Sequence, residues 1–160
     1  MPQDHDHDHE DLDDAIAKEL DVLVQEGTEL LEAGKDEAAR EKFEAGIALL
    51  PEPKHHWVAS TWLYASVGNI HFDAQRWEDA RENFAAAMKS PSGTGNPFIQ
   101  LRMGQSEFEL GNMGEAFHRL LFARMRGPQG LLDEVDAKYG EFVDAEATRR
   151  EQGASAFRKS

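Results

Sequence analysis

The chain of 160 residues contains no cysteine. This absence excludes disulfide bonds and thiol chemistry, and it is typical of a reducing compartment. Long apolar runs are also missing, because no stretch approaches the roughly 20 residues that a membrane-spanning helix needs. The first residues, MPQDHDHDHED, are acidic and rich in histidine. We therefore expect a soluble, cytoplasmic protein that does not bind membranes.

Positive charge is scarce in this sequence. It has 17 lysine and arginine residues against 31 aspartate and glutamate residues, which gives a formal net charge of −14. Such a charge repels nucleic acid phosphates and anionic lipids, so neither is an expected partner. A basic or neutral protein is the partner that the charge favours. The alternative is that the acidity only keeps a small protein in solution.

Sequence motifs of catalysis are absent as well. The chain has no glycine-rich phosphate loop, no nucleophile elbow and no HExxH helix. Paired carboxylates are abundant, but in so acidic a chain they are typical of exposed helix faces. His71 and His118 lie within expected helices, where histidines are more often packed or exposed than catalytic. We therefore predict a protein that is not an enzyme and binds no cofactor.

Three histidines near the N-terminus, His5, His7 and His9, alternate with aspartates. An extended strand would bring the three imidazoles to one side, where they could hold a transition metal. Residues 1–11 have no apolar side chain after Pro2, however, and are expected to be a disordered tail. Ordering such a tail around a metal costs entropy. A solvated tail without a metal site is the prediction, and metal binding by these histidines is the weaker alternative.

One pattern is present three times. An alanine is followed four residues later by a phenylalanine or a leucine, and a glycine lies twelve residues before each alanine. The three copies are Gly27, Ala39 and Phe43; Gly68, Ala80 and Phe84; and Gly104, Ala116 and Leu120. Such small residues let two paired helices approach closely. A single helix pair cannot bury its own apolar faces, so we expect the three copies to stack.

This pattern resembles the tetratricopeptide repeat (TPR) family, whose motif contains W-x2-L-G-x2-Y and A-x3-F elements. The resemblance implies an all-α fold, a right-handed TPR superhelix of three helix-turn-helix repeats. The repeats are expected at about residues 20–52, 57–92 and 97–128, with an insertion at 51–60. Gly34 and Gly111 mark turns between paired helices, and Gln75 stands at the corresponding place in the middle copy.

The segments on either side of the repeats complete the predicted domain, which spans residues 12–144. From Leu12 onward, apolar residues recur at helical spacing and predict an N-terminal extension within a long first helix that ends at Gly34. Another amphipathic stripe at about 131–144 predicts a capping helix, which a stack of repeats needs at its end. Apolar spacing then fades, so we expect residues 145–160 to form a frayed tail.

In TPR proteins the first helix of each repeat lines a concave groove that binds a partner. The resemblance places on that groove Val24, Thr28 and Leu31 from the first copy, Trp62, Asn69, Phe72 and Asp73 from the second, and Phe98, Leu101, Gln105, Phe108 and Glu109 from the third. It implies an aromatic groove with an acidic edge, in which Asn69 could hydrogen-bond the main chain of an extended peptide. These positions include no lysine or arginine, which disfavours capture of a partner's C-terminal carboxylate. The alternative is that the aromatic residues are core, or are covered by the chain's own first helix or tail.

Two interpretations of the function follow. The segments GNPFIQLRMGQSEFELGN (95–112) and GLLDEVDAKYGEFV (130–143) are similar to small bacterial TPR proteins encoded beside polymorphic or secreted toxins. That similarity implies an immunity protein that neutralises a toxin. The acidic chain would attract a basic toxin and could cover its active site. The alternative is a secretion chaperone like those of type III translocators, or a general adaptor, which holds an extended peptide. Both are non-enzymatic protein-protein interactions, and a homo-oligomer is compatible with either.

Overall fold

The computed structural model describes residues 12–159. In this part of the chain the regular structure is helical, and there is no strand. The elements are α1 (Asp14–Glu32), α2 (Asp36–Leu49), η2 (Lys54–His56), α3 (Val58–Asp73), α4 (Trp77–Lys89), α5 (Pro97–Glu109), α6 (Met113–Arg126), η3 (Leu131–Glu134) and α7 (Ala137–Lys159). The predicted all-α class is therefore confirmed. The expected tail at 1–11 lies outside the described residues.

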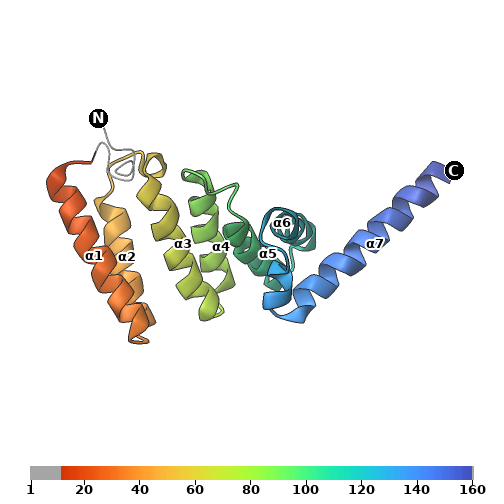
Figure 1. Cartoon of the computed structure of the whole chain (residues 1–160), viewed down its shortest axis with the longest axis horizontal. Helices are drawn as coiled ribbons and strands as arrows, with labels where there is room; N and C mark the ends of the chain where they lie inside the picture. Colours follow the sequence, from red (N-terminus) through yellow and green to blue (C-terminus); the bar gives the residue numbers. More distant parts are fainter. Residues whose placement is uncertain (1–11, 160) are drawn as a thin grey trace.

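Six of the helices form three consecutive pairs. Helix α1 packs on α2, α3 on α4 and α5 on α6, while contacts of α2 with α3 and of α4 with α5 join neighbouring pairs. Figure 1 shows these helices side by side in chain order, with α7 leading away from the end of the row. Three apolar clusters, which include Phe43, Phe84 and Leu120 respectively, run along the stack. The core is thus spread along the row rather than gathered at one centre.

Each pair is held closely together over its glycine. A Cβ atom added to Gly27 would lie 2.5 Å from Cε1 of Phe43, and one added to Gly68 would lie 2.8 Å from Cε1 of Phe84. In the third pair a Cβ on Gly104 would lie 2.8 Å from Cγ of Leu120. These distances are shorter than carbon atoms tolerate, so a larger residue would push the two helices apart.

The three turns inside the pairs share one hydrogen-bonding pattern. The amide of Lys35 donates to the carbonyl of Leu30, Arg76 to His71, and Asn112 to Glu107, at 2.8–2.9 Å. This is the Schellman arrangement, in which the residue before the donor adopts a left-handed conformation. That residue is Gly34 (φ 76°), Gln75 (φ 61°) or Gly111 (φ 85°).

The expected insertion forms a compact connection between α2 and α3. The peptide bond between Glu52 and Pro53 is cis, and η2 follows directly. Nζ of Lys54 donates to the carbonyl oxygens of Ile47 (2.9 Å) and Leu50 (2.8 Å), which satisfies acceptors at the end of α2. Helix α3 begins at Val58, and Trp57 is its N-cap residue.

The C-terminal region differs from the prediction. Residues 131–144 were expected to form one capping helix, but they contain η3 and, after a break, the first turns of α7. Helix α7 then continues to Lys159, although a frayed tail was expected over residues 145–160. Glu146 contributes to this continuation, because its carboxylate pairs with Arg149 and, at 2.9 Å, with Nε of Arg150. Such pairs three and four residues apart stabilise a helix that has few apolar contacts.

Candidate protein-binding cleft

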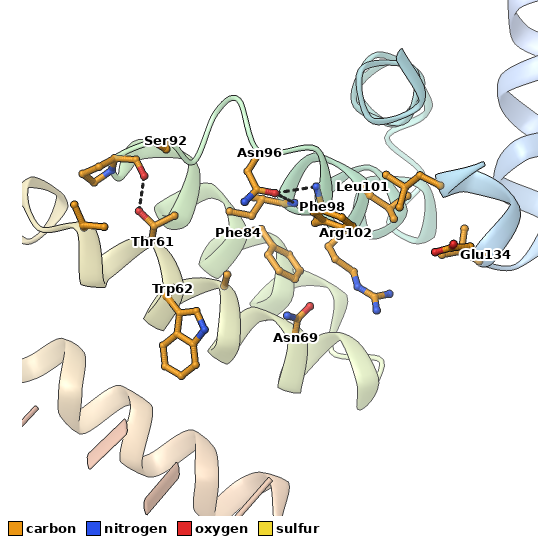
Figure 2. Close-up of a pocket in the computed structure, with 16 residues that line it drawn as sticks. Thr61, Trp62, Asn69, Phe84, Ser92, Asn96, Phe98, Leu101, Arg102 and Glu134 are labelled. Atoms are coloured by element: carbon orange, nitrogen blue, oxygen red, sulfur yellow. Dashed lines mark hydrogen bonds between the residues drawn. The ribbon is translucent and has the colours of Figure 1, made fainter. Parts of the chain in front are cut away.

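A cleft of about 700 Å3 opens between α3 and α5. The loop that joins α4 to α5 forms one of its rims, and η3 forms another. Figure 2 shows its side chains, among them Thr61, Trp62, Asn69, Phe98, Arg102 and Glu134. The cleft therefore combines residues of the second and third helix pairs with the segment that follows the third.

Two aromatic side chains of this cleft remain open to solvent. Trp62 is 47% exposed and Phe98 is 54% exposed. The indole of Trp62 also meets the ring of Phe43 edge to face, with centroids 5.2 Å apart, which fixes its orientation. Phe98 lies in the first turn of α5, where the side chain of Asn96 accepts hydrogen bonds from the amides of Phe98 (2.9 Å) and Ile99 (3.3 Å). This N-cap, with Pro97 at the first helical position, holds Phe98 at the mouth of the cleft.

Hydrogen bonds fix the loop rim of the cleft. The hydroxyl of Thr61 donates to the carbonyl of Pro91 at 2.7 Å, a bond drawn in Figure 2. The hydroxyl of Thr94 donates to the carbonyl of Met88, and the side-chain amide of Gln100 donates to the carbonyl of Thr94, both at 2.7 Å. The loop is thereby tied to three helices, so the cleft is preformed rather than shaped by a mobile segment.

Arg102 is a cleft residue that the sequence analysis missed. Its guanidinium lies 4.4 Å from the centroid of the Phe72 ring, and its Nη1 donates to the side chain of Gln105 at 3.2 Å. Within residues 12–159 it forms no ion pair with a carboxylate. Arg102 therefore adds one basic residue to a cleft whose predicted positions include no lysine or arginine. The signal was available, because residues 98, 102, 105 and 109 recur at helical spacing along one face of α5.

A second, more polar cleft of about 520 Å3 adjoins the first, and Arg102, Glu134 and Val135 line both. Its far side is a small cluster around Glu109. The hydroxyl of Tyr139 donates to Oε1 of Glu109 at 2.8 Å, and Nζ of Lys138 lies 2.5 Å from the same oxygen. These contacts attach the first turn of α7 to the end of α5.

The cluster shifts the pKa values of its members. Burial raises the pKa of Glu109, but the hydrogen bonds from Lys138 and Tyr139 outweigh it and hold the pKa below its usual 4.5. Burial, together with the Glu109 carboxylate, raises the pKa of the Tyr139 phenol. The carboxylate is therefore charged and the phenol protonated at neutral pH, which is the combination that the hydrogen bond requires.

The predicted groove residues fall into three groups. Those that line the main cleft are Trp62, Asn69, Phe98 and Leu101, and those that line the second cleft are Phe72, Gln105 and Glu109. Those that line neither of the two clefts are Val24, Thr28, Leu31, Asp73 and Phe108. Within the third group, Val24 and Leu31 pack on the first apolar cluster, the hydroxyl of Thr28 donates to the carbonyl of Val24, and Asp73 is exposed at the end of α3.

Part of the predicted groove is covered by the chain itself. The ring of Phe108 meets those of Tyr139 and Phe142 edge to face, at centroid distances of 5.3 and 5.2 Å. Leu101 is buried in the same cluster as Leu131. The inner surface of the third pair is thus covered by η3 and α7. The cleft between α3 and the start of α5 is open. Periodicity within α5 could not reveal this, because it carries no information on where a later segment docks.

The described part of the chain offers neither a metal site nor a membrane-spanning helix. Residues 12–159 contain no group of three or more histidine, cysteine, aspartate or glutamate side chains placed to hold a metal ion. His5, His7 and His9 lie outside the described residues. None of the helices in the described part of the chain combines the length and apolar character needed to cross a membrane.

Comparison with known proteins identifies the fold. No protein-family model and no curated protein matches the sequence. One similar solved structure is the type III secretion chaperone SycD of Yersinia enterocolitica in complex with a peptide of the translocator YopD. The TM-score is 0.62 at 14% sequence identity, and the match covers 82% of this chain and 94% of that one. The Hsp90 co-chaperone Cns1 of Saccharomyces cerevisiae is similar with a TM-score of 0.64 at 18% identity, covering 92% of this chain and 45% of that one. The chain therefore has a TPR-like helical fold.

Proposed function

We propose that this protein is a non-enzymatic interaction module that holds an extended, largely apolar segment of a partner protein in the cleft between α3 and α5. The observation that carries the proposal is the placement of Trp62 and Phe98, two large and exposed aromatic residues, at one preformed cleft. Aromatic side chains supply large contact area at low entropic cost and commonly dominate binding energy.

Polar groups in the cleft suit a peptide main chain. Asn69 is exposed on α3, and its amide offers both a donor and an acceptor. The guanidinium of Arg102 has five N–H donors, of which one is hydrogen-bonded to Gln105. These groups would take carbonyl and amide groups of an extended segment while its apolar side chains contact Trp62 and Phe98. Arg102 also offers a partner for one acidic side chain of that segment.

The likeness to SycD supports this mode of binding, because that structure contains a translocator peptide. A secretion chaperone or adaptor role in the cytoplasm is thus the interpretation that we favour. Neutralisation of a basic toxin stays a prediction from the sequence segments 95–112 and 130–143 and the net charge of −14. The two differ physically, since a neutraliser would present its acidic surface to a folded domain and a chaperone would hold a short linear segment.

The experiment is to purify the untagged protein with its partner from the native host, divide the partner into short peptides and measure their affinities by calorimetry. We expect one peptide to bind, and Trp62→Ala and Phe98→Ala each to weaken it by about tenfold or more. Met125→Ala on α6 is the matched control, because Met125 is 70% exposed and does not line the cleft.

The dependence of affinity on salt concentration distinguishes the two interpretations. Affinity for an apolar segment should change little between low and high ionic strength, whereas binding of a basic folded domain to the acidic surface should fall steeply. If no short segment binds and only a folded partner domain does, with strong salt dependence and no effect of Trp62→Ala, the cleft proposal is wrong and toxin neutralisation is favoured.

A further inference from the structure

The two clefts form one continuous path along α3 and α5. The lining of the main cleft begins near the start of both helices, at Val58 and Phe98. The lining of the second cleft reaches the ends of the same helices, at Phe72 and Glu109. Arg102 lines both clefts and lies where they meet. At about 1.5 Å per residue the path along α3 is about 21 Å long, which about six residues of an extended chain would span.

Arg102 is a half-buried cation on this path, and it has no acidic partner. Within residues 12–159, every other half-buried lysine or arginine lies within 4.0 Å of a carboxylate oxygen; these residues are Arg40, Lys42, Lys54, Arg76, Arg81, Arg119 and Arg124. The chain has 31 acidic residues against 17 basic ones, so carboxylates are not in short supply. Partial burial of a cation without a counter-charge costs free energy, which a carboxylate brought by a partner would offset.

The guanidinium of Arg102 is also held in a position to accept a carboxylate. It lies 4.4 Å from the centroid of the Phe72 ring, a contact that restrains its plane. Its Nη1 donates to Gln105 at 3.2 Å, which leaves further N–H groups of the five. The planar fork of these donors matches the two oxygens of a carboxylate.

The other charged groups along the path do not compete for Arg102. Glu109 is already paired with Lys138 at 2.5 Å. Glu134 and Asp136 are exposed, so water weakens the effect of their charges at the guanidinium. None of these three described carboxylates forms an ion pair with Arg102. Arg102 therefore remains available to an acidic group from outside.

The spacing along α5 relates this charge to the aromatic part of the cleft. Phe98 and Arg102 are four residues apart on one face of the helix, about 6 Å along its axis. In an extended segment, side chains two residues apart point to the same side and lie about 6.6 Å from each other. One residue would therefore separate the side chain that contacts Phe98 from the side chain that reaches Arg102.

We infer that the segment held in the cleft is acidic as well as apolar. A large apolar residue contacts Trp62 and Phe98, and an aspartate or glutamate two residues away binds Arg102 through its carboxylate. This inference rests on the proposed function and narrows its partner. It also reverses the preference that the net charge of −14 indicates, because the local lining of the cleft selects an acidic side chain.

A random octapeptide library displayed on phage is the probe, with each peptide fused through its C-terminus so that an acidic side chain is tested without a free terminal carboxylate. Selection on the immobilised full chain should enrich sequences with Asp or Glu two residues from a large apolar residue. Arg102→Leu should keep the apolar residue and lose the acidic one, and Arg102→Glu should select Lys or Arg at that place. Arg126→Leu is the matched control, because Arg126 is exposed on α6 and lines neither cleft.

Calorimetry with one enriched peptide, synthesised with an amidated C-terminus, measures the pair directly. Replacing its acidic side chain by the corresponding amide should weaken binding to the natural chain by about tenfold or more and should not change binding to Arg102→Leu. Enriched sequences that depend on Trp62 but show no acidic preference, or a preference that persists in Arg102→Leu, would overturn the inference and leave the proposed function standing. If no enriched sequence depends on Trp62, the proposed function fails and the inference fails with it.

Discussion

Each helix pair contains one contact in which a large side chain lies directly on the backbone of a glycine. We predict that Gly68→Ala destabilises the protein by about 1–3 kcal/mol, because the new methyl group would overlap the ring of Phe84 at 2.8 Å. The gain in helix propensity, about 1 kcal/mol, does not offset the displacement of a fully buried ring. Urea denaturation measures the difference in the free energy of unfolding.

Gly114→Ala is the control for this prediction. Gly114 also lies in a helix, α6, but a Cβ there has no neighbour within 4 Å. Its free energy of unfolding should stay equal or rise slightly. If Gly68→Ala and Gly114→Ala change the free energy of unfolding by the same amount, the close contact between α3 and α4 at Gly68 does not limit the stability of the fold.

The small residues could be found from the sequence because their contacts are local. Gly68 and Phe84 belong to two helices joined by a short turn, so their separation in sequence is nearly constant from one pair to the next. The faces of α3 and α5 were also predictable, as Trp62, Asn69 and Phe98 show. Arg102 was missed because the groove positions inferred from the TPR family do not include residue 102, although Arg102 lies on the same face of α5 as Phe98 and Gln105.

At the scale of elements, the attachment of α7 to α5 depends on the charge of Glu109. Its pKa in the folded protein lies below the unfolded value of 4.5. The stabilisation is therefore present above pH 4.5 and is lost as the pH falls through the folded value. We predict that acidification in this range loosens the first turns of α7, which hydrogen exchange of the Tyr139 and Val143 amides would detect as reduced protection.

Glu109→Gln provides the matched comparison. The amide keeps the size of the side chain but cannot pair with the Lys138 ammonium, so α7 should already exchange faster at neutral pH and show less change on acidification. Protection of α1, which packs on α2 at the other end of the stack, is the internal reference. Equal acid sensitivity in the two proteins would mean that other carboxylates, such as Glu37 beside Arg40 and Arg76, account for the change.

Helix α7 also shows which elements the sequence could and could not predict. Its first turns were expected from the stripe of Tyr139, Phe142 and Val143, which is apolar enough to require burial. Its continuation past residue 144 has no apolar stripe and depends on charged pairs around Glu146, whose contribution to helix formation is small for each pair. The docking of Tyr139 and Phe142 on Phe108 involves residues about 30 positions apart, and no local pattern encodes it.

At the scale of the whole molecule, the first half of α7 closes the helix stack and the second half leads away from it (Figure 1). The end of the stack is closed by Leu131, Leu132, Tyr139 and Val143, all buried in one cluster with Leu120 of α6. Burial of each such side chain contributes about 1.5–3 kcal/mol. Ala147 still packs against that cluster, and the guanidinium of Arg150 lies 4.3 Å from the centroid of the Phe117 ring, which belongs to it. Residues 151–159 contribute no buried side chain, so the cooperative fold should end near Arg150.

Two truncations test this division. Removal of residues 151–160 should leave the free energy of unfolding within about 0.5 kcal/mol of the full chain, whereas removal of 131–160 should expose Leu101 and Phe117 and cause unfolding of the third pair or aggregation. Unfolding should be measured in high salt, where attraction between charged groups of two copies is screened and self-association does not add to stability. Equal destabilisation by both truncations would mean that residues 151–159 are part of the cooperative core. If the shorter truncation leaves the free energy of unfolding unchanged, the first half of α7 is sufficient to close the stack, and the rest of the helix is held only by its own backbone and charged pairs.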